Sequence, residues 1–373
     1  MSHIKKYIIK EATRKRCQII PVSQEILKEF RSISLELYHL MYEADAIDFC
    51  VYIRISDEIV KFIKPNELSK ELLAQVWNAI QKPNSDVEVC VRNRDIPRFQ
   101  RLIDRIRKQK INALLEKDPS LDPQALHVFA DLSSASQMIV RGGINENLAR
   151  KVTAAASYMV SNLMNNDVAM GTLSRMIYID PTLYDHSASV AMFSVIMATR
   201  QLEKKLSQKD AVVLAQCGLY HDTGKSCVPS CILNKPSSFT PSEYKVMQTH
   251  TILGHKELMA AIEVGAPIDP LVARVAVEHH ERFNGHGYPY GRRGRAEHDS
   301  NNGIHLYTRI VSIADAYSAL LMKRVYKPAL EPQEAIRLMS KNAEKDFDAE
   351  IFRTFVTGCE KSLHKVTVQR KAS

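Results

Sequence analysis

The sequence lacks any long apolar run. No hydrophobic stretch approaches the roughly 18 residues that a helix needs to cross a bilayer, so we predict no membrane span. The first residues, MSHIKKYIIKEATRKR, are basic but contain neither a continuous apolar segment nor a small-residue cleavage site. They therefore do not resemble a secretion signal.

Cysteine is sparse as well. The chain has 7 cysteines, which are scattered and odd in number. This usage is typical of a reducing compartment, where thiols act as small buried hydrophobes, and it predicts a cytoplasmic protein. Cys227 and Cys231 lie close enough in sequence for a zinc site, but no second cysteine pair accompanies them, so unpaired thiols are the favoured interpretation.

Basic residues outnumber acidic ones, which gives a formal net charge of +9. Such a surplus favours anionic partners such as nucleotides, nucleic acid or a lipid surface, without choosing among them. The basic N-terminus could contact nucleic acid, although a solvated chain end is the favoured interpretation.

A chain of 373 residues is too long for one hydrophobic core and predicts at least two domains. The stretch FCVYIRISDEIVKFIK (49–64) alternates apolar and polar residues around a polar break, which predicts a β-hairpin. VEVCV (87–91) predicts a third strand, and 96–117 a basic amphipathic helix. We therefore predict a small α/β domain over residues 1–117, with a role in sensing, docking or dimerisation.

The strand pattern ends at KDPSLDPQ (117–124), which marks a boundary. From about 125 to 362 the apolar residues recur with the helical period. The predicted fold is therefore mainly α, with an all-helical C-terminal bundle. We expect a helical linker region at 118–170, a functional domain at 171–362 and a frayed tail at 363–373.

Histidines and aspartates fall within or at the rim of apolar helical stripes in this bundle. They are His186, His221, Asp222, His250, His279, His280 and Asp315. Burial of such polar groups is costly unless they share a partner, and a metal ion would serve several of them at once. Imidazole with carboxylate suits first-row divalent ions. An aspartate flanked by histidines suits a pair of ions, an arrangement used in phosphoryl chemistry.

Four motifs in order carry a resemblance to a known family. HDTGK (221–225), ILNKPSSFTPSEYKVMQTHTILG (232–254), EHHERFNGHGYP (278–289) and RIVSIADAYSAL (309–320) resemble the HD-GYP branch of the HD superfamily. The resemblance covers roughly residues 180–326. It implies an all-α fold, a site for two or three metal ions, and hydrolysis of cyclic di-GMP to its linear form and onward to GMP.

The resemblance also implies roles for individual residues. The seven histidines and aspartates named above would be metal ligands, with Asp222 as the bridge between ions. Lys225 would contact the scissile phosphate, and Gly224 would let the chain turn away from the helix end. The signature loop beside the site would be Gly287, Tyr288 and Pro289, and the substrate-binding cations would be Arg324 and Lys327. The residues predicted to act in catalysis are Asp222 and Lys225.

Departures from the family pattern bear on the number of metals. Members with three metals have an acidic residue a few positions before the first histidine, where this chain has Thr182 in DPTLYDH. Asp185 is adjacent to His186 and would point away from it on a helix. Two divalent ions are therefore favoured over three, with iron or manganese ahead of nickel, zinc or magnesium. Many relatives also carry a second aspartate where this chain has Ser318, and the GRRGR stretch (291–295) could attract an anion or form a plain exposed loop.

The predicted function is metal-dependent hydrolysis of a cyclic dinucleotide, with cyclic di-GMP as the favoured substrate in bacterial signalling. In this mechanism the ions activate a water for attack on phosphorus, and Lys225 neutralises developing charge. The alternatives are hydrolysis of cyclic GMP-AMP, a cyclic mononucleotide or guanosine tetraphosphate, and a receptor that binds a cyclic dinucleotide with little turnover. A protein partner could bind the N-terminal domain or the signature loop, and the long helices could pair in a homodimer.

Overall fold

The structure, a computed structural model, divides the chain into two units. One contains Met1–Lys110 with Asn234–Ser238, and the other Ile111–Leu233 with Phe239–Ser373. The described residues are 18–33, 35–55, 58–68, 70–80, 87–163, 166–183, 185–201, 206–233, 235, 237–295, 303–322, 330–341 and 343–372. The basic N-terminus discussed above lies outside them.

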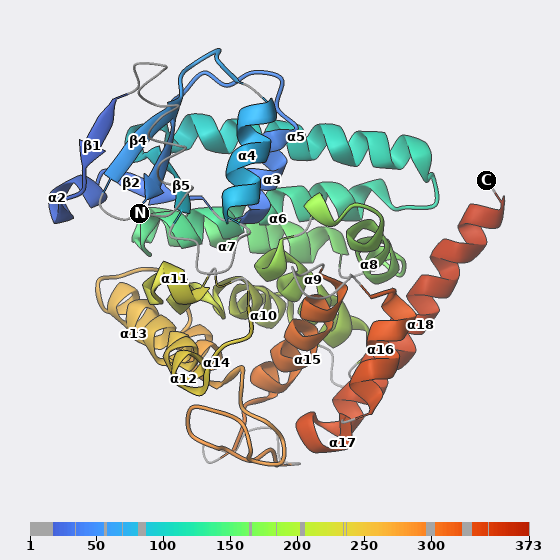
Figure 1. Ribbon diagram of the computed structural model, residues 1–373. Coiled ribbons are helices and arrows are strands. Elements are labelled where there is room, and N and C mark those ends of the chain that lie inside the picture. Colours follow the sequence, from blue (N-terminus) through green and yellow to red (C-terminus); the bar gives the residue numbers. More distant parts are fainter. Residues whose placement is uncertain are drawn as a thin grey trace. The chain divides into compact units, whose positions relative to one another are not determined.

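A five-stranded antiparallel sheet forms the centre of the first unit, with the strand order β1-β4-β3-β5-β2 (Figure 1). The predicted hairpin and third strand are confirmed as three adjacent strands of this sheet. The two outer strands have only three residues each, too few for a periodic pattern in the sequence. The strands are β1 (Ile19–Pro21), β2 (Phe30–Ser32), β3 (Val51–Ile55), β4 (Glu58–Ile63) and β5 (Val87–Arg92).

Helices pack on this sheet and close its apolar core. The core includes Phe49, Ile53, Val60, Val89 and Phe99, all buried. The predicted amphipathic helix over 96–117 is confirmed as α5, and the division between the two units falls inside it. The helices are α2 (Gln24–Leu27), α3 (Leu35–Tyr42), α4 (Lys70–Ile80) and α5 (Ile96–Lys117), with a short 3-10 helix, η1 (Asn93–Asp95).

The second unit is helical, as predicted, in the residues that the structure describes. Polar caps begin several of its helices: Asp122, Ser207 and Asp269 each accept hydrogen bonds from the first-turn amides that follow them. The helices are α6 (Pro123–Gly142), α7 (Glu146–Leu163), α8 (Ala169–Ile179), α9 (His186–Gln201), α10 (Gln208–Tyr220), α11 (Ser230–Leu233), α12 (Pro241–Gln248), α13 (His250–Glu263), α14 (Pro270–Glu278), α15 (Leu306–Leu321), α16 (Pro332–Ser340), α17 (Ala343–Asp346) and α18 (Ala349–Ala372), with two 3-10 helices, η2 (Pro181–Leu183) and η3 (Thr223–Cys227).

Helix α10 packs against α9, α14 and α15, while α13 packs against α14 and η3. In Figure 1, α10 lies between α9 and α14. This arrangement brings the N-termini of α9 and α13 toward the C-termini of α10 and α14. None of the described helices combines the length and apolar character that a bilayer crossing needs.

Two features of the helical unit differ from the sequence prediction. Helices α6 and α7, expected as a linker region, bury Phe129, Val152 and Met159 in the same core as α9 and α10. Helix α18 continues to Ala372, through most of the tail at 363–373 that the sequence predicts to fray. Leu363 and Val366 are buried, so apolar packing on the preceding turns supports this last stretch of helix.

A buried ion pair ties α15 to the start of α18. Arg309 Nη1 lies 2.7 Å from Asp348 Oδ2, and the Arg309 side chain is 2% exposed. The other Asp348 oxygen, Oδ1, accepts from the amides of Glu350 and Ile351 at 3.1 and 3.3 Å. One carboxylate therefore caps α18 and also neutralises a buried guanidinium.

We predict that Asp348→Ala lowers the free energy of unfolding by about 3–5 kcal/mol, because it leaves Arg309 buried without its counter-charge. Asp269→Ala removes only an exposed cap from α14 and should cost about 1 kcal/mol. Urea denaturation of both variants measures the difference. Equal losses would contradict the importance of the ion pair.

Candidate metal centre

Seven side chains predicted from the sequence to bind metal come together in the helical unit. Most lie at helix ends, where the chain can present a side chain past the last turn. They are His186 (first residue of α9), His221 and Asp222 (end of α10), His250 (first residue of α13), His279 and His280 (end of α14) and Asp315 (within α15). Together they form three overlapping groups whose ligand atoms lie within 4.8 Å of one another.

Backbone carbonyls orient three of the imidazoles. Nδ1 of His221 faces the carbonyl oxygen of Gly218 at 2.8 Å, and Nδ1 of His279 faces that of Ala276 at 2.8 Å. Nδ1 of His250 faces a third carbonyl, that of Met247, at 2.6 Å. A carbonyl only accepts, so each ring carries its proton on Nδ1 and leaves the lone pair of Nε2 free for another partner.

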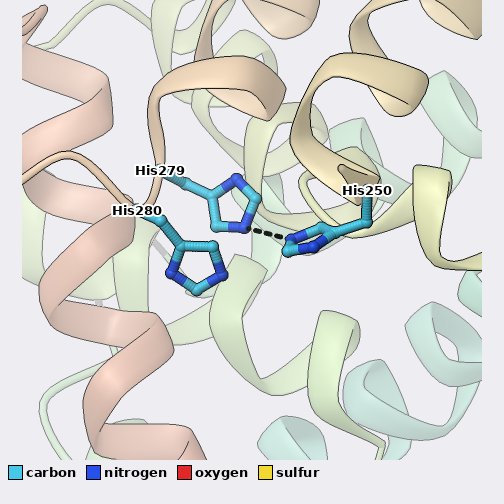
Figure 2. A group of neighbouring side chains, drawn as sticks. All are labelled: His250, His279 and His280. Carbon is cyan, nitrogen blue, oxygen red and sulfur yellow. Dashed lines mark hydrogen bonds between the residues drawn. The ribbon is translucent and has the colours of Figure 1, made fainter. Parts of the chain in front are cut away.

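His250, His279 and His280 form the first group (Figure 2). His250 faces the other two rings, and its Nε2 lies 3.3 Å from Nε2 of His279. Burial lowers the pKa of His250 to about 4 and also lowers the pKa of His279. At neutral pH both rings are uncharged with their protons on Nδ1, so two lone pairs face each other. This arrangement suits two ligands of one cation.

His186, His221 and Asp315 form the second group. Nε2 of His186 lies 3.0 Å from Oδ1 of Asp315, and Nε2 of His221 lies 4.0 Å from the same oxygen. The rings of His186 and His221 meet edge to face, with centroids 5.2 Å apart. Two imidazoles and a carboxylate thus surround one point from three different helices.

Asp222 lies between the two groups, and its two oxygens face opposite ways. Oδ2 is 3.2 Å from Nε2 of His221 and 3.6 Å from Nε2 of His186. Oδ1 is 3.4 Å from Nε2 of His250 and 3.7 Å from Nε2 of His279. A carboxylate placed in this way has the geometry of a bridge between two cations.

The charges around the site favour ionised carboxylates. Burial alone would raise the pKa of Asp222, but the neighbouring His221 and Lys225 hold it well below its usual value. Burial likewise opposes ionisation of Asp315, and its hydrogen bond and charge interaction with His186 still lower its pKa. For His221, burial lowers the pKa, but the carboxylates of Asp222 and Asp315 outweigh it and the net shift is upward. Two negative charges therefore persist within a shell of imidazoles.

The donor atoms fit a divalent metal. Nε2 of His221 and Oδ1 of Asp222 are buried without a hydrogen-bond partner among the described residues. Buried polar atoms are normally satisfied, and a cation between the histidines would satisfy both. Imidazole nitrogens with carboxylate oxygens are ligands that first-row divalent ions accept.

Lys225 points toward this centre. Its Nζ lies 2.5 Å from Oδ2 of Asp222, and its side chain is 37% exposed. The lysine therefore connects the buried carboxylate with solvent, at the position where the sequence predicts contact with a phosphate.

The residue before Lys225 lies at a close contact between η3 and α13. Gly224, which the sequence predicts to let the chain turn away from the helix end, lies in η3, just after the end of α10; it also has a packing role that the sequence does not predict. A Cβ at Gly224 would lie 2.0 Å from the carbonyl oxygen of His250 and 2.3 Å from the amide nitrogen of Gly254. The glycine therefore permits η3 to pack tightly on α13, which brings His250 next to Asp222.

The signature loop also reaches the centre. Tyr288 stacks on His280 with ring centroids 4.7 Å apart, and its amide donates to the His280 carbonyl at 3.2 Å. A Cβ at Gly287 would lie 2.4 Å from the Cα of Glu281, so only glycine allows the loop to fold back so closely. Pro289 follows Tyr288 in the same loop.

Two carboxylates that anchor this loop were missed in the sequence. Glu281 accepts from the amides of Tyr290 and Arg292 at 2.8 and 2.9 Å. Glu278 accepts from Nη1 of Arg292 at 2.7 Å and from Nε of Arg274 at 3.0 Å. Both are almost fully buried. The sequence could have indicated them, because they lie on either side of the His279–His280 pair. Acidic residues beside buried ligands need hydrogen-bond donors of their own. From the sequence, Arg292 could either attract an anion or belong to a plain exposed loop. In the structure its side chain binds Glu278.

Other candidates lie apart from the centre or outside the described residues. Arg324 and Lys327 fall in a stretch, 323–329, that the structure does not describe. Cys227 and Cys231 are exposed free thiols and belong to none of the metal-type groups found in the described residues. Asp185 precedes the first residue of α9 and caps this helix through the amide of Ala188, at 3.0 Å.

Comparison with known proteins adds independent findings. A family model described as an HD domain matches residues 149–351. A cyclic di-GMP phosphodiesterase of Pseudomonas aeruginosa is 35% identical over 242 residues, which are 64% of this chain and 55% of that protein. A 3′3′-cGAMP-specific phosphodiesterase of Vibrio cholerae is 34% identical over 172 residues, 46% of this chain and 34% of the relative. The chain thus spans 55% or less of the length of these relatives.

A solved structure shares the fold. Bd1817, a HDG"Y"P protein from Bdellovibrio bacteriovorus, superposes with a TM-score of 0.55 and 17% identity, and the match covers 88% of this chain and 98% of that one.

The contact at Gly224 yields a prediction. Gly224→Ala forces η3 and α13 apart at His250, so we expect a loss of about 1–3 kcal/mol in stability and weaker metal binding. Thermal unfolding with and without Mn²⁺ measures both. Ser226→Ala, a change on the exposed side of η3, should leave the metal-induced stabilisation intact. Wild-type stabilisation in the Gly224 variant would rule out the proposed packing role.

Proposed function

The chain belongs to the HD domain family, and we propose that it is a metal-dependent phosphodiesterase that hydrolyses a cyclic dinucleotide, with cyclic di-GMP as the favoured substrate. The matching family model and the fold shared with a HDG"Y"P protein confirm the family resemblance recognised in the motifs. The activity itself is proposed here because the chain spans only part of each curated relative.

One observation carries this proposal: the carboxylate of Asp222 faces a different group of imidazoles with each oxygen. In the proposed centre His186, His221 and Asp315 would hold one ion, His250, His279 and His280 would hold the other, and Asp222 would be a ligand of both. Two ions are favoured over three because Asp185 caps a helix and Asp180 accepts hydrogen bonds from Thr182. Iron or manganese is favoured, and nickel, zinc or magnesium would also suit some of these donors.

Such a pair of ions would supply Lewis acidity and a water of lowered pKa for attack on phosphorus. The chain's own residues bind and orient the phosphodiester. Lys225 neutralises charge that develops on a non-bridging phosphoryl oxygen as the ribose 3′ oxygen leaves. Tyr288, Gly287 and Pro289 form the wall beside His280, and we assign phosphate or guanine contacts to Arg324 and Lys327.

The substrate class rests on the relatives. The Pseudomonas and Xanthomonas campestris relatives are named cyclic di-GMP phosphodiesterases, the latter being the response regulator RpfG, which is 35% identical over 147 residues, 38% of this chain and 35% of that protein. The Vibrio relative named as specific for 3′3′-cGAMP supports the hybrid dinucleotide as a second candidate. A receptor with little turnover is the remaining alternative, and the complete donor set argues against it.

We propose a regulatory setting for the rest of the chain. We propose that residues 1–117 sense a signal or dock a partner and that the catalytic domain spans 171–362. The signature loop would be a second place for a protein partner, and paired long helices would give a homodimer. The cysteines within the described residues are all free thiols, which supports a reducing cytoplasm.

The proposed activity is tested with protein purified without oxygen. We expect about two divalent ions per chain by metal analysis, and conversion of cyclic di-GMP to linear products on chromatography. Asp222→Ala should lose both metal and turnover, because it removes the shared ligand. Parallel assays with cyclic GMP-AMP, a cyclic mononucleotide and guanosine tetraphosphate decide among the substrates. Binding of cyclic di-GMP without hydrolysis under any metal would favour a receptor instead.

Lys225→Ala separates phosphate binding from metal binding. We expect kcat to fall by about 10²–10³-fold, the usual effect of removing one group that stabilises transition-state charge, while both ions remain bound. Lys245→Ala on α12, an exposed lysine, is the matched control and should retain wild-type kcat. Unchanged turnover in the Lys225 variant would remove its proposed role.

A further inference from the structure

One histidine of the centre is oriented differently from its neighbours. Backbone carbonyls face Nδ1 of His221, His250 and His279. Nδ1 of His186 instead lies 3.2 Å from the hydroxyl oxygen of Ser318, a residue of α15. Ser318 is fully buried. The partner of Nδ1 in His186 is thus a side chain of another helix, whereas in the other three rings it is a backbone carbonyl.

We propose that Ser318 is the positioning residue for His186: when a cation takes the place of the Asp315 contact at Nε2, the Ser318 hydroxyl accepts the Nδ1 proton and holds the ring in position. An imidazole that binds metal through Nε2 must carry its proton on Nδ1, and the partner of that proton fixes both tautomer and ring angle. This inference rests on the proposed metal centre and adds a residue to it that does not itself touch metal or substrate.

Helix α15 holds the His186 ring from both ends. Asp315 and Ser318 are one turn apart, so they lie on the same face of the helix. Oδ1 of Asp315 is 3.0 Å from Nε2 of His186, and Oγ of Ser318 is 3.2 Å from Nδ1. The orientation of the ring is therefore set by the position of a single helix.

The same contacts make the two halves of the centre unequal. The His186 side chain is 22% exposed, whereas those of His250 and His279 are 1% and 0% exposed. A hydroxyl oxygen is also a weaker hydrogen-bond acceptor than an amide carbonyl oxygen, and the hydroxyl can rotate its own proton toward the ring. The Ser318 contact therefore distinguishes the setting of His186 from the settings of His250 and His279.

The test compares Ser318→Ala with Ser318→Thr, which keeps a hydroxyl, and with Ser174→Ala. Ser174 is another fully buried serine, whose hydroxyl donates to the carbonyl of Met170 and accepts from the hydroxyl of Tyr317 in α15. Its loss therefore removes buried hydrogen bonds beside Ser318 without touching a histidine. Calorimetric titration of each metal-free protein with Zn²⁺ gives the stoichiometry and both dissociation constants. His186→Ala identifies which binding step belongs to the His186 side.

In Ser318→Ala we expect the dissociation constant of the step assigned to His186 to rise about 10–100-fold, as is usual when the partner of a metal-binding imidazole is lost. The other constant should stay unchanged, Ser318→Thr should recover the wild-type value, and Ser174→Ala should match wild type. Nitrogen NMR of the Zn²⁺-loaded wild type should show His186 protonated on Nδ1, a readout that does not depend on any variant.

Two outcomes would overturn the inference: wild-type affinity for both ions in Ser318→Ala, or a wild-type His186 protonated on Nε2. Both leave the proposed function intact if wild-type protein binds two ions and hydrolyses its substrate. Wild-type protein that binds no divalent ion would instead contradict the metal centre itself, so the two failures are distinguishable.

Discussion

The carboxylate of Asp222 is the feature on which the organisation of the helical unit depends. A buried negative charge is costly unless cations or hydrogen-bond donors surround it. Here imidazoles approach both of its oxygens from opposite sides, and Lys225 contributes a positive charge at the solvent edge. Helices α9, α10, α13 and α14 all begin or end at this point.

The use of helix ends explains how so many donors meet in a small volume. At its end a helix leaves carbonyls without intrahelical partners, and His221 and His279 take up such carbonyls with Nδ1. The backbone then fixes the direction of each ring without further side chains. Donors placed on rigid elements hold their geometry better than donors on loops, which suits a site for divalent metal.

Much of the fold and of the candidate metal centre could be predicted from the sequence. The features that could not be predicted were missed for physical reasons. The seven donors were found because polar residues on apolar stripes are unusual, and because the motifs around them agree with a known family. The close packing at Gly224 could not be predicted, because it joins η3 to α13, a segment that comes later in the chain. Strands β1 and β2 were missed because three residues carry no period. The helical end of α18 was missed because a basic, polar sequence hides the burial of Leu363 and Val366.

The stretch from Glu278 to Glu281 serves two structures at once. Its two histidines face the ions' position, while its two glutamates hold the backbone and side chain of the signature loop. Because these four residues are consecutive, the glutamates that anchor the loop and the two histidines move together. A movement of the signature loop would therefore also move His279 and His280, and it would change the geometry of the metal centre directly.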